Sequence, residues 1–225
     1  MGSPWDLYDA RSHLGFWRHL VLREGQKGLV ASLHSNGAPP EVEAWILEKL
    51  PRWFEAGATG IRWMDSSNLA DVATGVLQQQ WGDLRVEEQL LGRRFVLSPD
   101  AFFQVHKEGA ELLVEAIGRA AGQGQVLLDL YCGTGAIGIA LSDRFARIIG
   151  IELFEPSVEA ARENAFINGV NAEYHCGAVE RTVTSLALPS EGLVVVVDPP
   201  RAGLHPDVAR YLGKLTAERL VYVAC

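Results

Sequence analysis

The rhythm of hydrophobic and polar positions changes near residue 98. Up to that point, alternating runs and one helical stripe are mixed. The turn residues 25–27 join the first two alternating runs into a predicted hairpin, and a helix is predicted over 40–54. The predicted strands cover residues 16–23, 28–34, 61–64, 84–90 and 94–97. This pattern indicates a small α+β domain over residues 1–97.

From residue 98 onward, apolar strands alternate regularly with helices. Ser98 and Pro99 fit the first turn of a helix that ends at Gly122 and Gly124. Further helices are predicted at 136–145, 156–168 and 207–214, and strands at 126–131, 147–151, 173–175, 193–197 and 220–223. Continuously apolar strands between helices are typical of a parallel sheet covered on both faces, with ligands at the carboxyl ends of its strands. We therefore predict an α/β, Rossmann-like domain over residues 98–225.

Composition narrows the class of protein. The chain has 225 residues, of which 48% are hydrophobic and 21% charged, as in ordinary globular proteins. No apolar run reaches the roughly 20 residues of a membrane span and the N-terminus lacks a secretion signal, so we expect a cytoplasmic protein without membrane contact. The net charge of −8 gives no support for a nucleic-acid partner. Cys132, Cys176 and Cys225 show no metal-ligand spacing, and we expect the first two to be packing residues.

A glycine-rich loop follows the strand at 126–131. The run from Gly133 through Gly135 to Gly138 matches G-x-G-x-x-G, and Glu152 lies 19 residues after Gly133 at the end of the next strand. A nicotinamide-dependent oxidoreductase shows the same features. Asp129, four residues before Gly133, would repel a pyrophosphate but suits a cationic ligand. Asp129 therefore favours S-adenosylmethionine over a dinucleotide as the ligand. The alternative to ligand binding is that the glycines only form a tight turn between strand and helix.

An acid and two prolines follow the apolar strand at 193–197. Asp198, Pro199 and Pro200 lie where chemistry occurs in such sheets, and Arg201 comes next. Amino-group methyltransferases use a similar turn, usually with an aromatic residue in the place of Arg201. Two consecutive prolines by themselves indicate only a turn in the chain.

Several segments together resemble one family. They are "GFWRHLVLREG" (15–25), "SPDAFFQVH" (98–106), "LLDLYCGTGAIG" (127–138), "IGIEL" (149–153), "DPPRAGLHP" (198–206) and "LVYVAC" (220–225). In this order and spacing they resemble the RNA uridine-C5 methyltransferases, which make 5-methyluridine in tRNA or rRNA. The resemblance implies a Rossmann-like S-adenosylmethionine-dependent domain after a central α+β domain that can contact RNA. We also expect a monomer.

The resemblance also implies roles for individual residues. It makes Cys225 the nucleophile and places the cofactor contacts on Gln104, Asp129, Tyr131, Gly133, Gly135, Glu152 and Asp198. Arg201 is interpreted either as a contact to RNA phosphate or the uracil carbonyls, or as a solvated loop residue. A cysteine thiolate suits this chemistry, because its addition to uracil C6 turns C5 into a nucleophile, and the target base must be flipped or single-stranded.

The chain departs from the family pattern after Cys225. The family continues with two further strands and a glutamate that removes the C5 proton, and neither follows Cys225 here. Ala178 occupies the place of an acid that binds the adenine amine. We therefore expect either a fragment of a longer enzyme or a remnant that binds cofactor or RNA without turnover. His106 replaces a usual asparagine, and we interpret it as structural.

Overall fold

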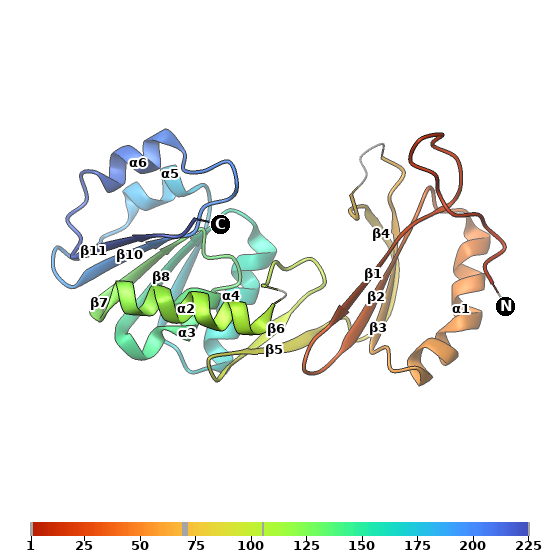
Figure 1. Cartoon of the computed structure of the whole chain (residues 1–225), viewed down its shortest axis with the longest axis horizontal. Helices are drawn as coiled ribbons and strands as arrows, with labels where there is room; N and C mark the ends of the chain where they lie inside the picture. The colour runs from red at the N-terminus through yellow and green to blue at the C-terminus, as the bar shows by residue number, and fades with distance from the viewer. Residues whose placement is uncertain (1, 69–71, 105, 225) are drawn as a thin grey trace. The chain divides into compact units, whose positions relative to one another are not determined.

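The chain divides into two compact units. The computed structural model describes residues 2–68, 72–104 and 106–224, so Cys225 lies outside the described residues (Figure 1). The two units are Met1–Glu87 and Glu88–Cys225. Strands β5 (Val86–Leu90) and β6 (Arg93–Leu97) pair with each other at this division, whereas the sequence pattern changes at residue 98.

The first unit is a four-stranded sheet with one helix packed on it. Its strands, in the order β1-β2-β3-β4, are β1 (Trp17–Glu24), β2 (Leu29–Ser35), β3 (Gly60–Asp65) and β4 (Val76–Gly82). Strands β2 and β3 are parallel, which requires a crossover, and helix α1 (Pro40–Glu55) supplies it. The buried stripe of α1, Val42, Ile46 and Leu50, meets Ile61 and Trp63 of the sheet. These elements confirm the predicted hairpin and helix.

The second unit is a five-stranded, all-parallel sheet. Its strands are β7 (Gly124–Leu130), β8 (Phe145–Glu152), β9 (Ala172–Cys176), β10 (Leu193–Val197) and β11 (Arg219–Tyr222), in the order β11-β10-β7-β8-β9. The chain leaves β7 towards β8 and β9 and returns on the other side of β7 to form β10. A topological switch point therefore lies between β7 and β10, where ligands bind in such sheets.

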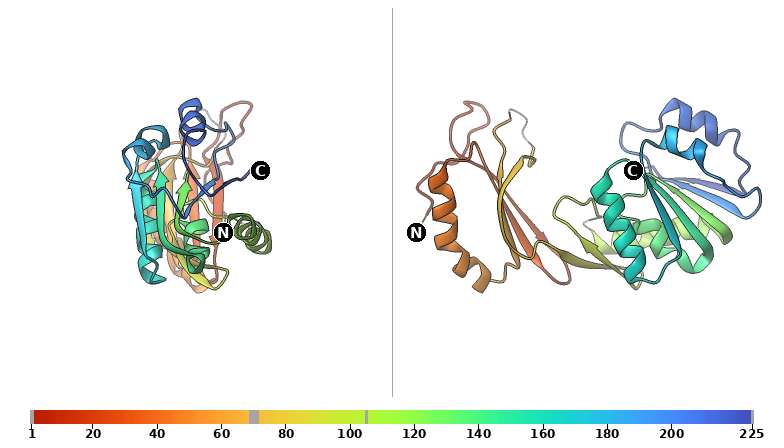
Figure 2. Two further views of the ribbon diagram at one scale, coloured as in Figure 1. Left: turned by 90° about the vertical axis from the view of Figure 1, so that its left-hand side faces the viewer. Right: turned by 180° about the vertical axis from the view of Figure 1, so that it is seen from behind.

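Helices cover both faces of this sheet. They are α2 (Lys107–Ala121), α3 (Ala136–Ala140), α4 (Glu155–Ile167), α5 (Val179–Thr182) and α6 (Pro206–Leu212), with 3₁₀ turns at Ser142–Arg144 and Val183–Ser185. Figures 1 and 2 show α5 and α6 on one face and α2, α3 and α4 on the other. Leu128 and Leu130 of β7 pack under α5 and α6, so the alternation of the strand turns Asp129 towards α3. The Rossmann-like α/β prediction is confirmed.

Two sequence predictions are wrong in detail, and one strand was missed. The helix expected at Ser98 begins at Lys107, because the His106 Nδ1 atom accepts a hydrogen bond from Gly109 N at 2.8 Å and caps the first turn. The helix expected over 136–145 ends at Ala140, and Phe145 already belongs to β8. Strand β4 was not predicted at all. Its glutamines carry no strand signal, and pairing with β3 holds it in the sheet.

No described helix is both long and apolar enough to cross a membrane.

Candidate cofactor and active site

A pocket lies at the switch point, at the carboxyl ends of β7 and β10. It holds about 590 Å³ of empty space, including its mouth. The irregular segment 102–104, helix α2 and the loop after β7 form its walls, and Asp198 closes one side. Among the predicted site residues, Gln104, Tyr131, Gly133 and Asp198 line this pocket. The structure therefore brings together side chains from three separate sequence motifs.

Two glycines of the loop have different reasons to be glycine. Both adopt positive φ, +53° at Gly133 and +78° at Gly135, a region that L side chains rarely occupy. A Cβ atom at Gly135 would lie 2.6 Å from the Tyr174 hydroxyl, whereas one at Gly133 would meet nothing within 4 Å. Gly135 is therefore required by packing beneath the loop, and Gly133 leaves the pocket side open.

Tyr131 joins the strand to this loop in an unusual conformation. Its φ is +64°, which is uncommon for a residue with a bulky side chain and marks local strain. The side chain is half-buried in the pocket wall, and burial raises the pKa of its hydroxyl above the ordinary value. Strain of this kind is typical of functional loops, and the cofactor role of Tyr131 stays a prediction.

Asp129 lies beneath the pocket rather than in its described wall. Its side chain is fully buried, and Oδ2 accepts a hydrogen bond from Gly138 N at 3.1 Å. Oδ1 is buried and has no hydrogen-bond partner among the described residues. Burial, followed by the nearby charges of Asp198 and Glu152, raises the pKa of this carboxyl from 3.8 to about 7, against the lowering effect of the Gly138 bond.

Glu152 braces the loop from the neighbouring strand. Its Oε2 accepts from Gly133 N at 3.2 Å, and its Oε1 accepts from Leu153 N at 2.8 Å and Phe154 N at 2.9 Å. These three backbone donors orient the carboxylate at the end of β8. The structure thus gives Glu152 a structural role, and its contact with a ribose stays a prediction.

A third acidic group, Asp198, directly follows the end of β10. Asp198 is half-buried, and burial raises its pKa above the usual range. Beside it, the Val223 N–H donates to the Val197 carbonyl at 2.9 Å, which continues the pairing of β11 with β10. Arg201 lies exposed in the following turn. The described segment up to Val223 therefore runs along β10, which Asp198 directly follows.

Sequence reasoning missed part of the pocket wall. Phe102 and Phe103 contribute to it directly, and the motif that singled out Gln104 contains both. Tyr174 of β9 lies under the loop, but no local signal identified it, because Tyr174 and Gly135 are 39 residues apart. Cys132 is buried as expected, although it also lines the pocket. Cys176 is exposed, so its interpretation as a packing residue was wrong.

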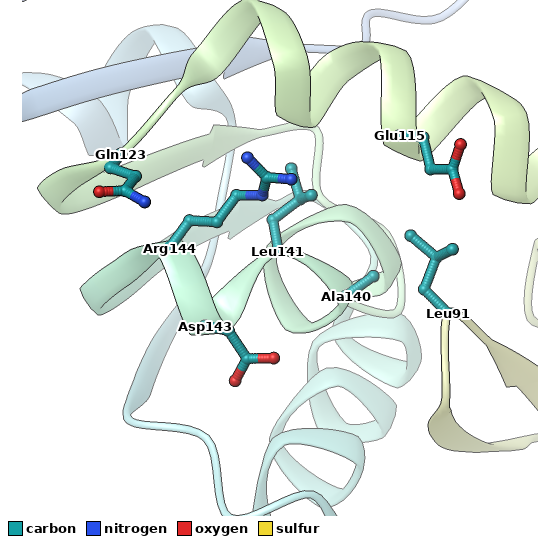
Figure 3. A pocket seen from close by; sticks show the side chains of 7 residues that line it. All are labelled: Leu91, Glu115, Gln123, Ala140, Leu141, Asp143 and Arg144. Atoms are coloured by element: carbon teal, nitrogen blue, oxygen red, sulfur yellow. The ribbon is translucent and has the colours of Figure 1, made fainter.

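A second pocket lies at the amino ends of the strands (Figure 3). Gln123 precedes β7 and Arg144 precedes β8, and neither belongs to a motif singled out in the sequence. The Arg144 guanidinium donates to the Gly118 carbonyl at 3.3 Å, and Asp143 pairs with Arg93 at 2.5 Å. The charged side chains Arg144 and Asp143 of this pocket are thus already bonded to other residues of the fold.

Within the described ranges, no group of three or more His, Cys, Asp or Glu residues could hold a metal ion.

Comparison with known proteins gives a consistent result. The family model "tRNA (Uracil-5-)-methyltransferase" matches residues 78–175. The mouse tRNA (uracil-5-)-methyltransferase homolog A is 37% identical over 99% of this chain and 39% of its own length. The tRNA (uracil(54)-C(5))-methyltransferase of Pyrococcus furiosus is 31% identical over 99% of this chain and 51% of its own length. The chain thus spans about half the length, or less, of these relatives.

A solved structure agrees with both the fold and the sequence similarity. The tRNA (uracil-54, C5)-methyltransferase of Pyrococcus abyssi, determined in complex with S-adenosyl-L-homocysteine, superposes with a TM-score of 0.80 at 29% identity. The match covers 97% of this chain and 52% of that one. The similarity therefore extends over both units of the chain.

Proposed function

We propose that the chain belongs to the tRNA (uracil-5-)-methyltransferase family and that it transfers a methyl group from S-adenosylmethionine to C5 of a uridine in RNA. The observation that carries the proposal is the pocket at the switch point, which joins the Gln104 segment, the glycine loop and Asp198. The names of the relatives favour tRNA over rRNA as the substrate. The chain spans about half the length of those relatives, or less, so the activity and the substrate of the whole protein are both part of the proposal.

The chemistry of the pocket fits S-adenosylmethionine. This cofactor carries an ammonium group and supplies a methyl group on a sulfonium. The described lining contains no Lys, Arg or His, whereas acidic side chains lie in its wall and beneath it, at Asp198 and Asp129. A pyrophosphate would face the Asp198 carboxylate without a cation, which argues against a nicotinamide dinucleotide.

We assign the cofactor contacts as the sequence motifs indicated. Gln104, Tyr131, Gly133 and Asp198 are in the wall and hold the ligand directly, while Gly135 shapes the loop. Glu152 is proposed to accept the ribose hydroxyls in addition to its backbone donors. The apolar remainder of the wall, including the buried Val114, excludes water from the ligand.

Cys225 is proposed as the nucleophile. Its thiolate adds to C6 of uracil, which makes C5 electron-rich and able to take the methyl group. A base then removes the C5 proton, and elimination of the thiolate restores the double bond. Strand β11 runs beside β10, and the hydrogen bond from Val223 N–H to the Val197 carbonyl keeps the described chain beside β10 past the end of β11; Cys225 itself lies outside the described residues. Arg201, exposed in the adjoining turn, is proposed to contact RNA phosphate or the uracil carbonyls.

Cofactor binding is the first test. We expect calorimetry to show S-adenosylmethionine and S-adenosylhomocysteine binding to the chain with micromolar dissociation constants and NADH not binding. The variant Asp198→Asn keeps the shape of the wall and should weaken binding. Binding of NADH in preference to S-adenosylmethionine would contradict the proposal.

Covalent trapping tests the nucleophile separately. RNA containing 5-fluorouridine should form a stable adduct, because the thiol can add to C6 but no C5 proton is available for removal. The adduct should be lost in Cys225→Ala and retained in the matched control Cys176→Ala, whose thiol is exposed elsewhere on the unit. An adduct that survives in Cys225→Ala would remove this residue from the mechanism, as would its absence from a folded wild-type chain that binds the cofactor.

We further propose that the chain is a cytoplasmic monomer whose residues 1–97 contribute RNA contacts. Light scattering should give a mass near 24.6 kDa, and fractionation of the native source should place it in the cytoplasm. Crosslinking to tRNA followed by mass spectrometry should recover peptides from residues 1–97.

A further inference from the structure

The placement of Asp129 differs from that of the other acids near the pocket. It is fully buried on β7, with one oxygen held by Gly138 N and the other without a described partner. An ionised carboxylate in this position would leave a buried, charged oxygen without a hydrogen bond, which is costly. A protonated carboxyl is less costly in this position, because it carries no charge and its carbonyl oxygen can still accept from Gly138 N.

The groups around Asp129 reinforce this preference. Carboxylates approach from the ends of two neighbouring strands, Glu152 on β8 and Asp198 after β10. A phenol, Tyr174, approaches from β9, and a thiol, Cys132, from the loop. Burial raises the pKa of both, so they contribute no charge at neutral pH. Among the described groups that influence Asp129, none supplies a positive charge.

We propose that Asp129 is a positioning residue that carries a proton while the pocket lacks a cation and releases it when the positively charged cofactor binds. The inference rests on the proposed function, because it requires a cationic ligand in this pocket. The O–H bond of the Asp129 carboxyl breaks, its electron pair stays on the carboxylate, and the proton passes to solvent. The ionised carboxylate keeps the Gly138 bond, so α3 remains anchored while the cofactor charge is neutralised from beneath the loop.

The raised pKa of the Asp129 carboxyl supports the proposal. Burial and the two neighbouring acids raise its pKa to about 7, so the carboxyl is partly protonated at neutral pH. A cation in the pocket favours the ionised form and lowers that pKa. By linkage, cofactor binding must then strengthen as the pH rises towards 7 and level off above it.

Calorimetry in buffers of different ionisation enthalpy measures the released protons directly. For wild-type protein and S-adenosylmethionine at pH 7, we expect release of about half a proton per site, rising towards one at pH 6. The association constant should rise by up to about tenfold per pH unit between pH 5 and pH 7. A change in the protonation of the cofactor itself also contributes to the measured proton release. The quantity of interest is therefore the difference in proton release between wild type and Asp129→Asn.

Asp129→Asn is the decisive variant, because an amide oxygen can accept from Gly138 N but cannot ionise. We expect it to bind the cofactor with the additional proton release abolished and the steep pH dependence removed. Asp143→Asn is the matched control, since it removes an exposed carboxylate outside the pocket and should keep the wild-type proton count. An equal proton count in wild type and Asp129→Asn would overturn the inference while leaving the proposed function intact.

A measurement on the free protein covers the case in which no cofactor binds. The ¹³C chemical shift of the Asp129 carboxyl, followed by NMR from pH 4 to pH 9, should titrate near neutrality. Titration near pH 4 would overturn the inference whatever the ligand. Titration near neutrality without any binding of S-adenosylmethionine would confirm that Asp129 carries a proton. It would contradict the proposed cofactor, and therefore both the proposed function and the proton release on binding.

Discussion

The two units bury polar groups in different ways. In the first unit, the Trp63 Nε1–H donates to Ser35 Oγ at 2.7 Å, and that hydroxyl donates in turn to the Gly37 carbonyl at 2.8 Å. In the second unit, the Asp129 Oδ1 atom and the Tyr174 hydroxyl are buried beneath the glycine loop without a described partner. Buried polar atoms are normally satisfied, so exceptions need a reason. These two atoms lie next to the candidate pocket.

The cores also differ in composition. The first unit combines aliphatic residues of α1 with a group of partly buried aromatic rings, whereas β10 of the second unit consists of five fully buried aliphatic residues. All six tryptophans of the chain lie in the first unit. The contrast indicates that the second unit supports its pocket with a uniformly apolar sheet, whereas the core of the first unit depends on aromatic packing. Tryptophan fluorescence therefore reports on the first unit alone.

The largest effect is expected from Leu128→Ala in the centre of the parallel sheet. Leu128 is fully buried, and a large-to-small change of this kind costs about 2–5 kcal/mol of the free energy of unfolding. The loss should move the circular-dichroism midpoint more than the tryptophan-fluorescence midpoint, because the tryptophans report on the first unit. Leu112→Ala, at an exposed position of α2, is the control. Equal shifts of both midpoints would show that the units unfold together.

A second pair of variants compares the two loop glycines. Gly135→Ala combines backbone strain with a clash against the Tyr174 hydroxyl and should cost about 2–4 kcal/mol of stability. Gly133→Ala has strain alone and should cost about 1 kcal/mol. Urea unfolding of both variants gives the difference, and similar losses would mean that Tyr174 does not restrict Gly135.

The stability of Asp129→Asn should depend on pH in a defined direction. The folded-state pKa of about 7 lies above the unfolded value of 3.8, so the folded wild type binds the extra proton and loses stability as the pH rises between these values. Relative to wild type, Asp129→Asn should gain about 2–3 kcal/mol between pH 5 and pH 8. Thermal unfolding at several pH values measures the gain, and a parallel pH dependence of the two proteins would contradict it.

The smallest effect is expected at the start of α2. His106→Ala removes the acceptor for Gly109 N and should cost about 1 kcal/mol, in the range of other N-cap losses. Chemical denaturation should detect this loss, whereas Glu115→Gln on the exposed face of the same helix should change stability by less than about 0.5 kcal/mol. If His106→Ala does not lower the stability, another group must accept the hydrogen bond from Gly109 N–H.

The sequence by itself determined the periodic parts of the fold. The stripe of Val42, Ile46 and Leu50 after Pro40 predicted α1, and the apolar run 193–197 predicted β10 with its bounds. The glycine loop and Asp198 were placed correctly at the carboxyl ends of their strands. These features were predictable because helix period, strand period and glycine spacing are local properties of the chain.

Only the tertiary structure decided how the polar groups are paired. Two residues of the site, Asp129 and Glu152, are both acids at strand ends in sequence, yet one is buried with an unpartnered oxygen and the other accepts three backbone hydrogen bonds. Strand β4, the start of α2 at Lys107 and the exposure of Cys176 were decided in the same way. Burial and hydrogen-bond partners depend on residues far apart in the chain, so a local pattern contains too little information to predict them.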